Sequence, residues 1–225
     1  MNLVDTHCHL IHERLINQID EVIVRAKAAG LKALIVSGVN PASNHVVLEL
    51  AKKYPIIKAS LGIYPIDALG LAPDESGLPR HHGPINIDKE FDFFNEHKKE
   101  IISIGEVGLD YNWDKEHHEQ QKKNFKKIIE LTKKLNKPIV VHTRKAEEDC
   151  VAMLESSDIK HIILHSFEGR KHLIKHAAEL GFYFSIPASI VRSQHFQMMV
   201  DIVPLTQIFT ETDSPWLSPF KDDKP

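Results

Sequence analysis

The stretch Leu3-Val4-Asp5-Thr6-His7-Cys8-His9 runs from an apolar pair into Asp-x-His-x-His. If this stretch is a β-strand, its side chains alternate between two faces, so His7 and His9 point the same way. Two imidazoles on one face at the end of a strand can bind one metal ion. The stretch therefore predicts a metal site at the mouth of a sheet, with further ligands supplied from elsewhere in the chain.

Seven further β-branched runs follow along the chain, with helical patterns between them. The expected strands are Leu3–His7, Ala33–Val39, Ile56–Gly62, Ile101–Glu106, Ile139–His142, His161–His165, Phe182–Ile186 and Ile208–Thr212. The expected helices include Leu15–Ala29, Asn44–Lys53, Glu116–Leu135 and Leu173–Leu180. Buried strands followed by amphipathic helices are typical of βα units in a parallel sheet.

Eight such units predict an α/β fold of the TIM type, a (β/α)8 barrel, which needs at least ~200 residues. We expect one barrel domain over residues 1–225. An open doubly wound sheet is the alternative, and it would place its ligand site at one switch point of the sheet.

Composition excludes several classes of protein. The net charge is −3 with histidine neutral, so no strong field recruits nucleic acid. The two cysteines form no disulfide framework, and no stretch resembles a signal peptide or reaches the ~20 apolar residues of a membrane span. We therefore expect a cytoplasmic protein.

The long connection Pro65–Lys89, rich in proline, glycine and histidine, is either a substrate-facing lid or a disordered insertion.

Polar side chains gather at the ends of five expected strands. They are His7, His9, Glu106, His142, His165 and Asp213. Each alone is weak evidence, because a lone histidine is often a core residue and a lone carboxylate is often a helix cap. Strand ends converge on one face of a barrel, however, and two carboxylates buried together there would cost several kcal/mol without a cation. The set fits two divalent ions that share a bridging carboxylate and water, with Zn²⁺ favoured and Mg²⁺ or Mn²⁺ as alternatives.

At these residues the chain resembles the TatD family of metal-dependent hydrolases, which belong to the amidohydrolase-like barrels. The motifs that carry the resemblance are DTHCH (5–9), GIYP (62–65), GEVGLDY (105–111), PIVVHTR (138–144), HSFEG (165–169) and ETDSPWLSP (211–219). The resemblance implies that His7 and His9 bind one metal ion together with Asp213. It also implies that Glu106 bridges the two ions and that His142 and His165 bind the second.

The sequence departs from the family pattern in two places. Tyr64 stands where the family often has histidine in Gly-x-His-Pro, so a substrate contact there is expected to differ. Family members also continue past the last strand with an Arg-Asn-Glu-Pro segment and further helices. We therefore expect either a fragment or a barrel without its closing helix, which would leave apolar barrel surface bare.

The resemblance implies a deoxyribonuclease of the TatD type that hydrolyses phosphodiesters at DNA ends. Asp213 is expected to orient the attacking water and to accept its proton, while Glu106 holds the metal pair together. Arg144 either binds a phosphate oxygen or pairs with a loop carboxylate. The run Ile101–Gly108 contains no lysine, so the carbamylated lysine that bridges the metals in many related barrels is not available.

Two other functions remain open at this point. The same metals would serve acyl transfer, as in a deacylase or amidohydrolase acting on an ester or amide such as aminoacyl-tRNA. A non-catalytic metal-binding barrel is the third reading, although all six ligand candidates are intact. If DNA is the substrate, the low net charge favours a single-stranded end over tight duplex binding.

Overall fold

The computed structural model describes residues 3–73 and 76–220, and its strands form one parallel sheet. The strands are β1 (Leu3–Cys8), β2 (Leu31–Ser37), β3 (Ile57–Ile63), β4 (Ile101–Asp110), β5 (Ile139–Arg144), β6 (Ile162–His165), β7 (Tyr183–Pro187) and β8 (Ile208–Glu211). They follow one another around the sheet in sequence order, each parallel to the next. This confirms the predicted (β/α)8 barrel and excludes the doubly wound alternative, whose strand order reverses at a switch point.

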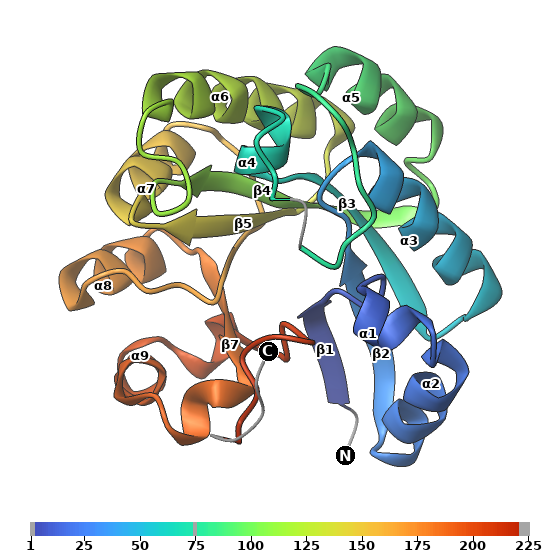
Figure 1. Ribbon diagram of the computed structural model, residues 1–225. Coiled ribbons are helices and arrows are strands. Elements are labelled where there is room, and N and C mark those ends of the chain that lie inside the picture. Colours follow the sequence, from blue (N-terminus) through green and yellow to red (C-terminus); the bar gives the residue numbers. More distant parts are fainter. Residues whose placement is uncertain (1–2, 74–75, 221–225) are drawn as a thin grey trace.

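Helices connect the strands and surround the barrel (Figure 1). The α-helices are α1 (Glu13–Ile16), α2 (Ile19–Ala28), α3 (Pro41–Lys53), α4 (Pro65–Ala68), α5 (Ile87–Glu96), α6 (His118–Leu135), α7 (Glu147–Glu155), α8 (Lys171–Glu179) and α9 (Gln194–Ile202), and the 3₁₀ turns are η1 (Ala188–Val191) and η2 (Leu205–Gln207). None of these described helices combines the length and apolar character needed to cross a bilayer.

One predicted helix differs from the observed structure. The expected helix Leu15–Ala29 is interrupted between α1 and α2, where the side chains of Asn17 and Gln18 donate to the carbonyls of Glu13 and Arg14. Such side-chain bonds to the backbone compete with continued helix.

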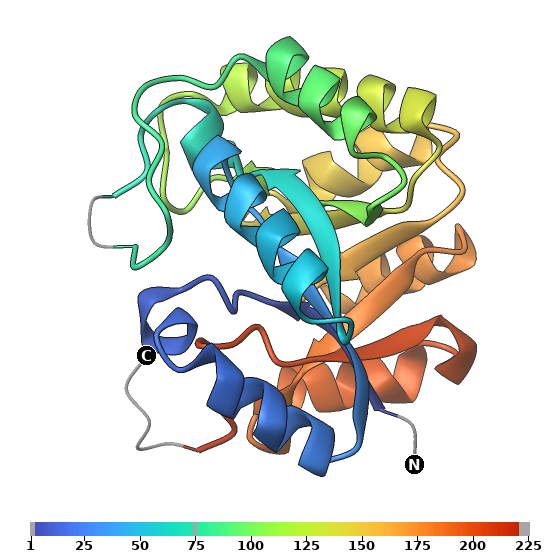
Figure 2. The same cartoon turned by 90° about the vertical axis from the view of Figure 1, so that its right-hand side faces the viewer.

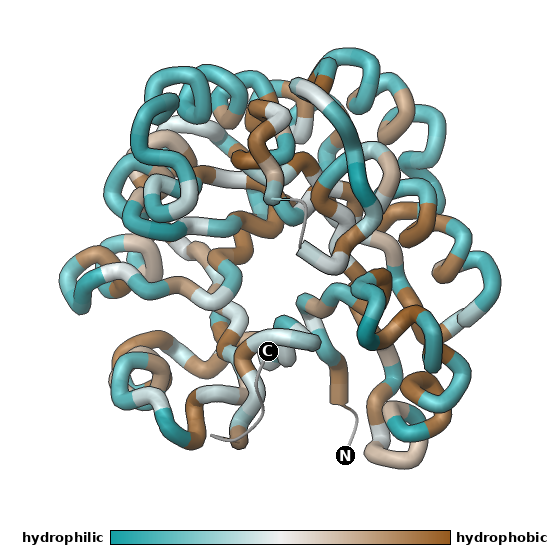
Figure 3. Tube along the Cα trace, in the orientation of Figure 1, coloured by the Kyte–Doolittle hydropathy of each residue, from teal (hydrophilic) through white to brown (hydrophobic). Residues whose placement is uncertain are grey.

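The core lies on both sides of the strands, as expected for a parallel sheet. Isoleucine, leucine, valine and phenylalanine side chains fill it, and the apolar segments of the chain face inward while the outer helix faces are polar (Figure 3). Apolar side chains fill most positions within β2 to β7, and the polar side chains of the candidate site stand where the strands end. The fold thereby brings the strand ends identified in the sequence to one face of the barrel.

β1 and β8 meet where the barrel closes, and side-chain hydrogen bonds largely replace a regular ladder of backbone hydrogen bonds between them. The side chains of Thr6 and Thr210 donate to the carbonyls of Thr210 and Val4, respectively. Beyond the end of β8, the N–H of Asp213 donates to the carbonyl of His7, and the N–H of His9 donates to the carbonyl of Ser214. The seam is therefore tightest at the carboxyl end of the strands, where the candidate ligands lie.

The outer side of this seam is thinly covered. No helix follows β8 within residues 212–220, and no described helix lies outside β1 and β8 between α9 and α2 (Figure 1). Leu3, Val4 and Phe209 are exposed there. Apolar side chains are therefore exposed along the outer side of this seam in the part of the chain that the structure describes.

The connection after β3 extends beyond the carboxyl ends of the strands (Figure 2). Its described part is tied to the barrel, because the carbonyl of Gly77 accepts from the N–H of Glu13 and that of Pro79 accepts from the side chain of Asn40. Gly77 has φ +71°, and a Cβ there would lie 2.3 Å from the His12 ring. Only glycine fits this approach without strain. Hydrogen bonds thus hold the described part of the connection at the barrel mouth.

A buried side chain on α3 fixes the neighbouring strands under the site. Asn44 donates to the carbonyl of Gly62 (2.8 Å) and to the Glu90 carboxylate (2.7 Å), and its Oδ1 accepts from the N–H of Gly62 (3.0 Å). Gly62 in turn packs so closely on Glu106 that a Cβ would lie 2.2 Å from the Glu106 backbone nitrogen. Asn44 therefore sets the position of β3 against the strand that carries Glu106.

We expect Asn44→Ala to lower the free energy of unfolding by about 3 kcal/mol, because it leaves buried backbone and carboxylate groups unpaired. Urea unfolding followed by circular dichroism measures the change. Glu49→Ala, an exposed position on the same helix, is the control and should shift stability by no more than ~0.5 kcal/mol. Equal midpoints for the two variants would contradict this role for Asn44.

Candidate metal centre

Five strands deliver six ligand-type side chains to one place. His7 and His9 come from β1 and its end, Glu106 from β4, His142 from β5, His165 from the last residue of β6, and Asp213 from two residues after β8. All six are buried or nearly so; the most exposed are the side chains of Asp213, at 15%, and His142, at 13%. The structure brings together every ligand candidate that the sequence singled out.

The first group of donors surrounds one point between β1, β4 and the segment after β8. Nε2 of His7 and Nε2 of His9 are 3.1 Å apart, and they lie 3.4 and 3.2 Å from Oε2 of Glu106. Both nitrogens are 3.6 Å from Oδ1 of Asp213. Ligands bound ~2.0–2.1 Å from a tetrahedral zinc ion are separated by ~3.3–3.4 Å. The two imidazoles and two carboxylates therefore fit one divalent ion.

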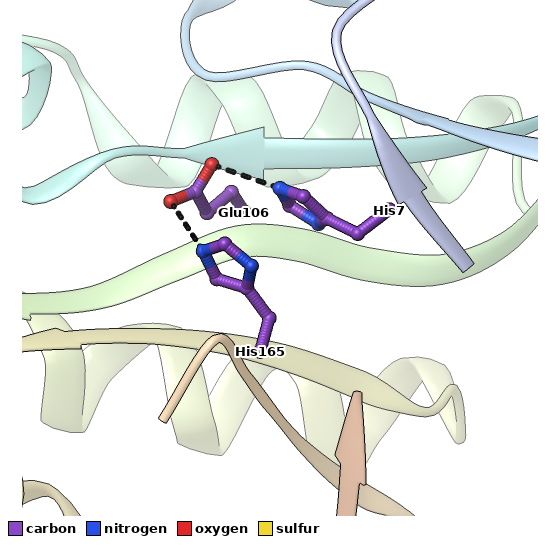
Figure 4. Close-up of side chains that lie close together, drawn as sticks. All are labelled: His7, Glu106 and His165. Atoms are coloured by element: carbon purple, nitrogen blue, oxygen red, sulfur yellow. Dashed lines mark ion pairs between the residues drawn. The ribbon is translucent and has the colours of Figure 1, made fainter. Parts of the chain in front are cut away.

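The second group uses the other oxygen of the same carboxylate. Oε1 of Glu106 lies 2.9 Å from Nδ1 of His142 and 3.4 Å from Nε2 of His165. Figure 4 shows the two oxygens of Glu106 directed to different imidazoles, one to His7 and one to His165. The rings of His7 and His165 are stacked with their centroids 3.9 Å apart. Glu106 thus lies between His7 and His9 on one side and His142 and His165 on the other, and donor atoms of His7, Glu106 and His165 lie close enough together to hold a metal ion.

Burial and mutual charge shift the protonation of these groups. Burial, together with the nearby His165, lowers the pKa of His7 to about 3. His7 is therefore neutral at pH 7, the form in which imidazole binds metal. The pKa of Glu106 is held well below its usual range, because the surrounding imidazoles, His165 foremost, outweigh burial, which acts in the opposite direction. Burial raises the pKa of Asp213 to about 7, so this carboxylate can take up a proton near neutral pH.

Each imidazole is oriented by a bond from its other ring nitrogen. Ser37 contacts both His7 and His9. Its Oγ lies 3.2 Å from Nδ1 of His7, and its carbonyl oxygen lies 3.1 Å from Nδ1 of His9. On the other side of the site, Nδ1 of His165 lies 3.3 Å from the Glu211 carboxylate, which also accepts from the Ser185 hydroxyl. Such partners fix the tautomer of a ligating histidine and raise its basicity.

Asp110 holds the fourth imidazole and a nearby loop at once. Its Oδ2 is 3.0 Å from Nε2 of His142 and accepts from the Tyr64 hydroxyl at 2.6 Å. Its Oδ1 accepts from the backbone N–H groups of Asn112 and Trp113, both at 2.9 Å. Tyr64 therefore contacts the partner of His142, and its hydroxyl is 3.4 Å from Nε2 of that ring.

A pocket of about 630 Å³ opens from these groups to solvent. Its wall includes Tyr64 and Arg144, the two predicted substrate contacts, together with Asp67, Leu78 and Trp113. Within the described residues no carboxylate lies within ion-pair distance of the exposed Arg144 guanidinium, which disfavours the ion-pair alternative. Burial raises the pKa of Asp67 to about 6, and its carboxylate accepts from Asn40.

Sequence reasoning did not identify two residues beside the centre. Glu211 is buried and contacts His165, and the alternation of side chains on a strand, which places it on the same face as Asp213, was the available signal. Trp113 lines the pocket, but a tryptophan within a loop carries no pattern that would place it there.

We expect Glu211→Gln to weaken divalent-ion binding about ten- to a hundred-fold, because His165 loses its anionic partner. Competition with a fluorescent chelator measures the affinity. Glu148→Gln, at an exposed position on α7, serves as the control and should bind metal like the unaltered protein. Unchanged affinity in Glu211→Gln would show that this contact does not support metal binding.

Comparison with known proteins identifies the family of this chain. The family model described as TatD related DNase matches residues 4–225. Human deoxyribonuclease TATDN3 is 33% identical over 98% of this chain and 81% of its own length, and the metal-dependent hydrolase YabD of Bacillus subtilis is 31% identical over 96% and 82%. The crystal structure of YJJV, a TatD homolog from Escherichia coli, superimposes with a TM-score of 0.83 at 21% identity, covering 99% of this chain and 84% of that one. With these motifs, this barrel and these matches, the chain belongs to the TatD related DNase family.

Proposed function

We propose that this protein is a divalent-metal-dependent deoxyribonuclease that hydrolyses phosphodiester bonds at single-stranded DNA ends. The observation that carries the proposal is the position of the Glu106 carboxylate. One of its oxygens faces His7 and His9, and the other faces His142 and His165. Family membership supports nuclease chemistry, because curated relatives are named as deoxyribonucleases and metal-dependent hydrolases.

In this proposal the chain holds two metal ions. His7, His9 and Asp213 would bind the first, and His142 and His165 the second, with Glu106 bridging them. When bound, a pair of divalent ions activates water and stabilises charge on a phosphoryl oxygen. A donor set with four imidazoles favours Zn²⁺ over Mg²⁺ or Mn²⁺, which prefer oxygen ligands.

Side chains of the pocket would supply the remaining steps. Asp213, which lies against the imidazoles of His7 and His9 and lines the pocket, orients the attacking water and accepts its proton. Arg144, exposed on the pocket wall, binds a nonbridging phosphate oxygen. Tyr64, whose hydroxyl reaches both Asp110 and His142, contacts the substrate from the same side.

The same observations bear on the competing readings. All six donors are present and the imidazoles are oriented by further hydrogen bonds, which favours a working centre over an inert scaffold.

We also propose a reducing, cytoplasmic setting, supported by the two buried thiols of Cys8 and Cys150, which are unpaired.

We expect Asp213→Asn to lower kcat/KM about 10²- to 10⁴-fold on a single-stranded oligodeoxynucleotide, because it removes the proton acceptor. Glu106→Ala should abolish divalent-dependent cleavage, because both ions lose their shared ligand. Gel-resolved cleavage with added Zn²⁺, Mg²⁺ or Mn²⁺ measures the rates, and unfolding curves check that the variants are folded.

Glu148→Gln is the matched control, since Glu148 is an exposed carboxylate on α7 and does not line the pocket. Its rate should equal that of the unaltered protein. Parallel assays on ester and amide substrates distinguish phosphodiester hydrolysis from acyl transfer. Wild-type cleavage by both cluster variants would refute the two-metal proposal, and turnover of the ester or amide substrate alone would favour the deacylase.

A further inference from the structure

The two tryptophans of the chain both line the pocket, but their surroundings differ. Trp216 packs edgewise on His9 and His12, with ring centroids 5.2 and 5.3 Å away. Trp113 is 62% exposed, and its indole makes no ring contact with the residues that the structure describes. Tryptophan is highly buried in most proteins, and leaving so large an apolar surface in water is unfavourable. An indole without a ring partner among the described residues, at the mouth of this pocket, therefore points to a ligand with a flat face.

The turn that presents Trp113 is held on both sides. Asp110 accepts from the Trp113 N–H on one side, and the Asp114 carboxylate accepts from the N–H groups of Glu116 and His117 on the other. Gln121 joins the two, because its amide donates both to the carbonyl of Asp110 and to the carboxylate of Asp114, each at 2.9 Å. These bonds, of which the two from Gln121 are buried, fix the backbone of the turn before any ligand arrives, so little entropy would be lost on binding.

The same turn is tied directly to the metal centre. One oxygen of Asp110 accepts from the Trp113 N–H, and the other lies 3.0 Å from Nε2 of His142. Arg144 follows His142 by two residues and lines the same pocket, without a carboxylate partner among the described residues. One wall of the pocket therefore offers, next to the candidate ligands, an unpaired cation and an unpaired aromatic face. A nucleotide unit carries the complementary groups, a phosphate and a base.

We propose that Trp113 forms a base-stacking subsite for one nucleotide of single-stranded DNA, with Arg144 on the adjoining phosphate. The naming of DNA rests on the function proposed above. Stacking on an aromatic side chain accepts every base, because each base has a π-face. In a duplex both faces of an interior base are already covered by its neighbours, so the subsite selects unpaired nucleotides. This explains how a chain with a net charge of −3 could hold DNA without a broad basic surface.

The test combines substitutions in the protein with abasic sites in the DNA, and the dissociation constant Kd is measured for each combination. Asp213→Asn is the parent protein, so that the DNA stays intact, and Zn²⁺ is present throughout. Fluorescence anisotropy gives Kd for a labelled octathymidylate and for versions with a single abasic site at each successive position. In the parent, one abasic position should raise Kd about ten-fold, within the range for loss of one stacked base.

Adding Trp113→Ala to the parent should raise Kd for the intact strand about ten-fold and abolish the penalty at that abasic position. Trp113→Phe should retain most of the affinity, because a phenyl ring still stacks. Leu205→Ala is the control, an exposed apolar residue ahead of β8 and so at the opposite end of the strands, and it should leave Kd unchanged.

An unchanged Kd in Trp113→Ala, an abasic penalty that persists in that variant, or no binding by the parent at millimolar concentration would each overturn the subsite. The outcome is separable from the nuclease proposal. DNA that binds through Trp113 but is never cut by the unaltered protein would support the subsite and refute the nuclease. If the DNA is cut but substitution of Trp113 does not change Kd, the nuclease proposal is supported and the subsite is refuted.

Discussion

The carboxylate of Glu106, buried among four imidazoles, is the interaction on which the rest of the structure depends. It contacts His7 and His9 through one oxygen and His142 and His165 through the other. A buried charge is tolerated only where partners and geometry compensate its lost hydration. The four partners come from β1 and the residue after it, β5 and β6, and the barrel brings the ends of these strands together around one carboxylate.

The surrounding structure fixes that carboxylate at two levels. Glycine at position 62 lets β3 approach the backbone of Glu106, whose N–H donates to the carbonyl of Gly38 on the neighbouring segment. Farther out, Asp110, Glu211 and Ser37 orient the imidazoles from their far sides. The seam between β1 and β8 is joined by bonds at the level of His7 and Asp213, and so the weakest part of the barrel is secured where the centre requires it.

The barrel and the set of six side chains could be predicted because both depend on local pattern. Strand runs are recognisable from β-branched residues, and a side chain at a strand end has one destination in a barrel. The helix α7 is only weakly amphipathic, so its residues give a weaker periodic signal. The relation of Asp110 to Trp113, His142 and Tyr64 could not be predicted, because it depends on how a loop folds back onto neighbouring strands.

The central claim is that one carboxylate bridges two metal ions, and anomalous X-ray diffraction from crystals grown with Zn²⁺ tests it most directly. Data collected at the zinc edge should show two peaks per chain. One peak should contact Oε2 of Glu106 together with His7, His9 and Asp213, and the other should contact Oε1 together with His142 and His165. A single peak, or peaks that do not contact Glu106, would contradict the claim.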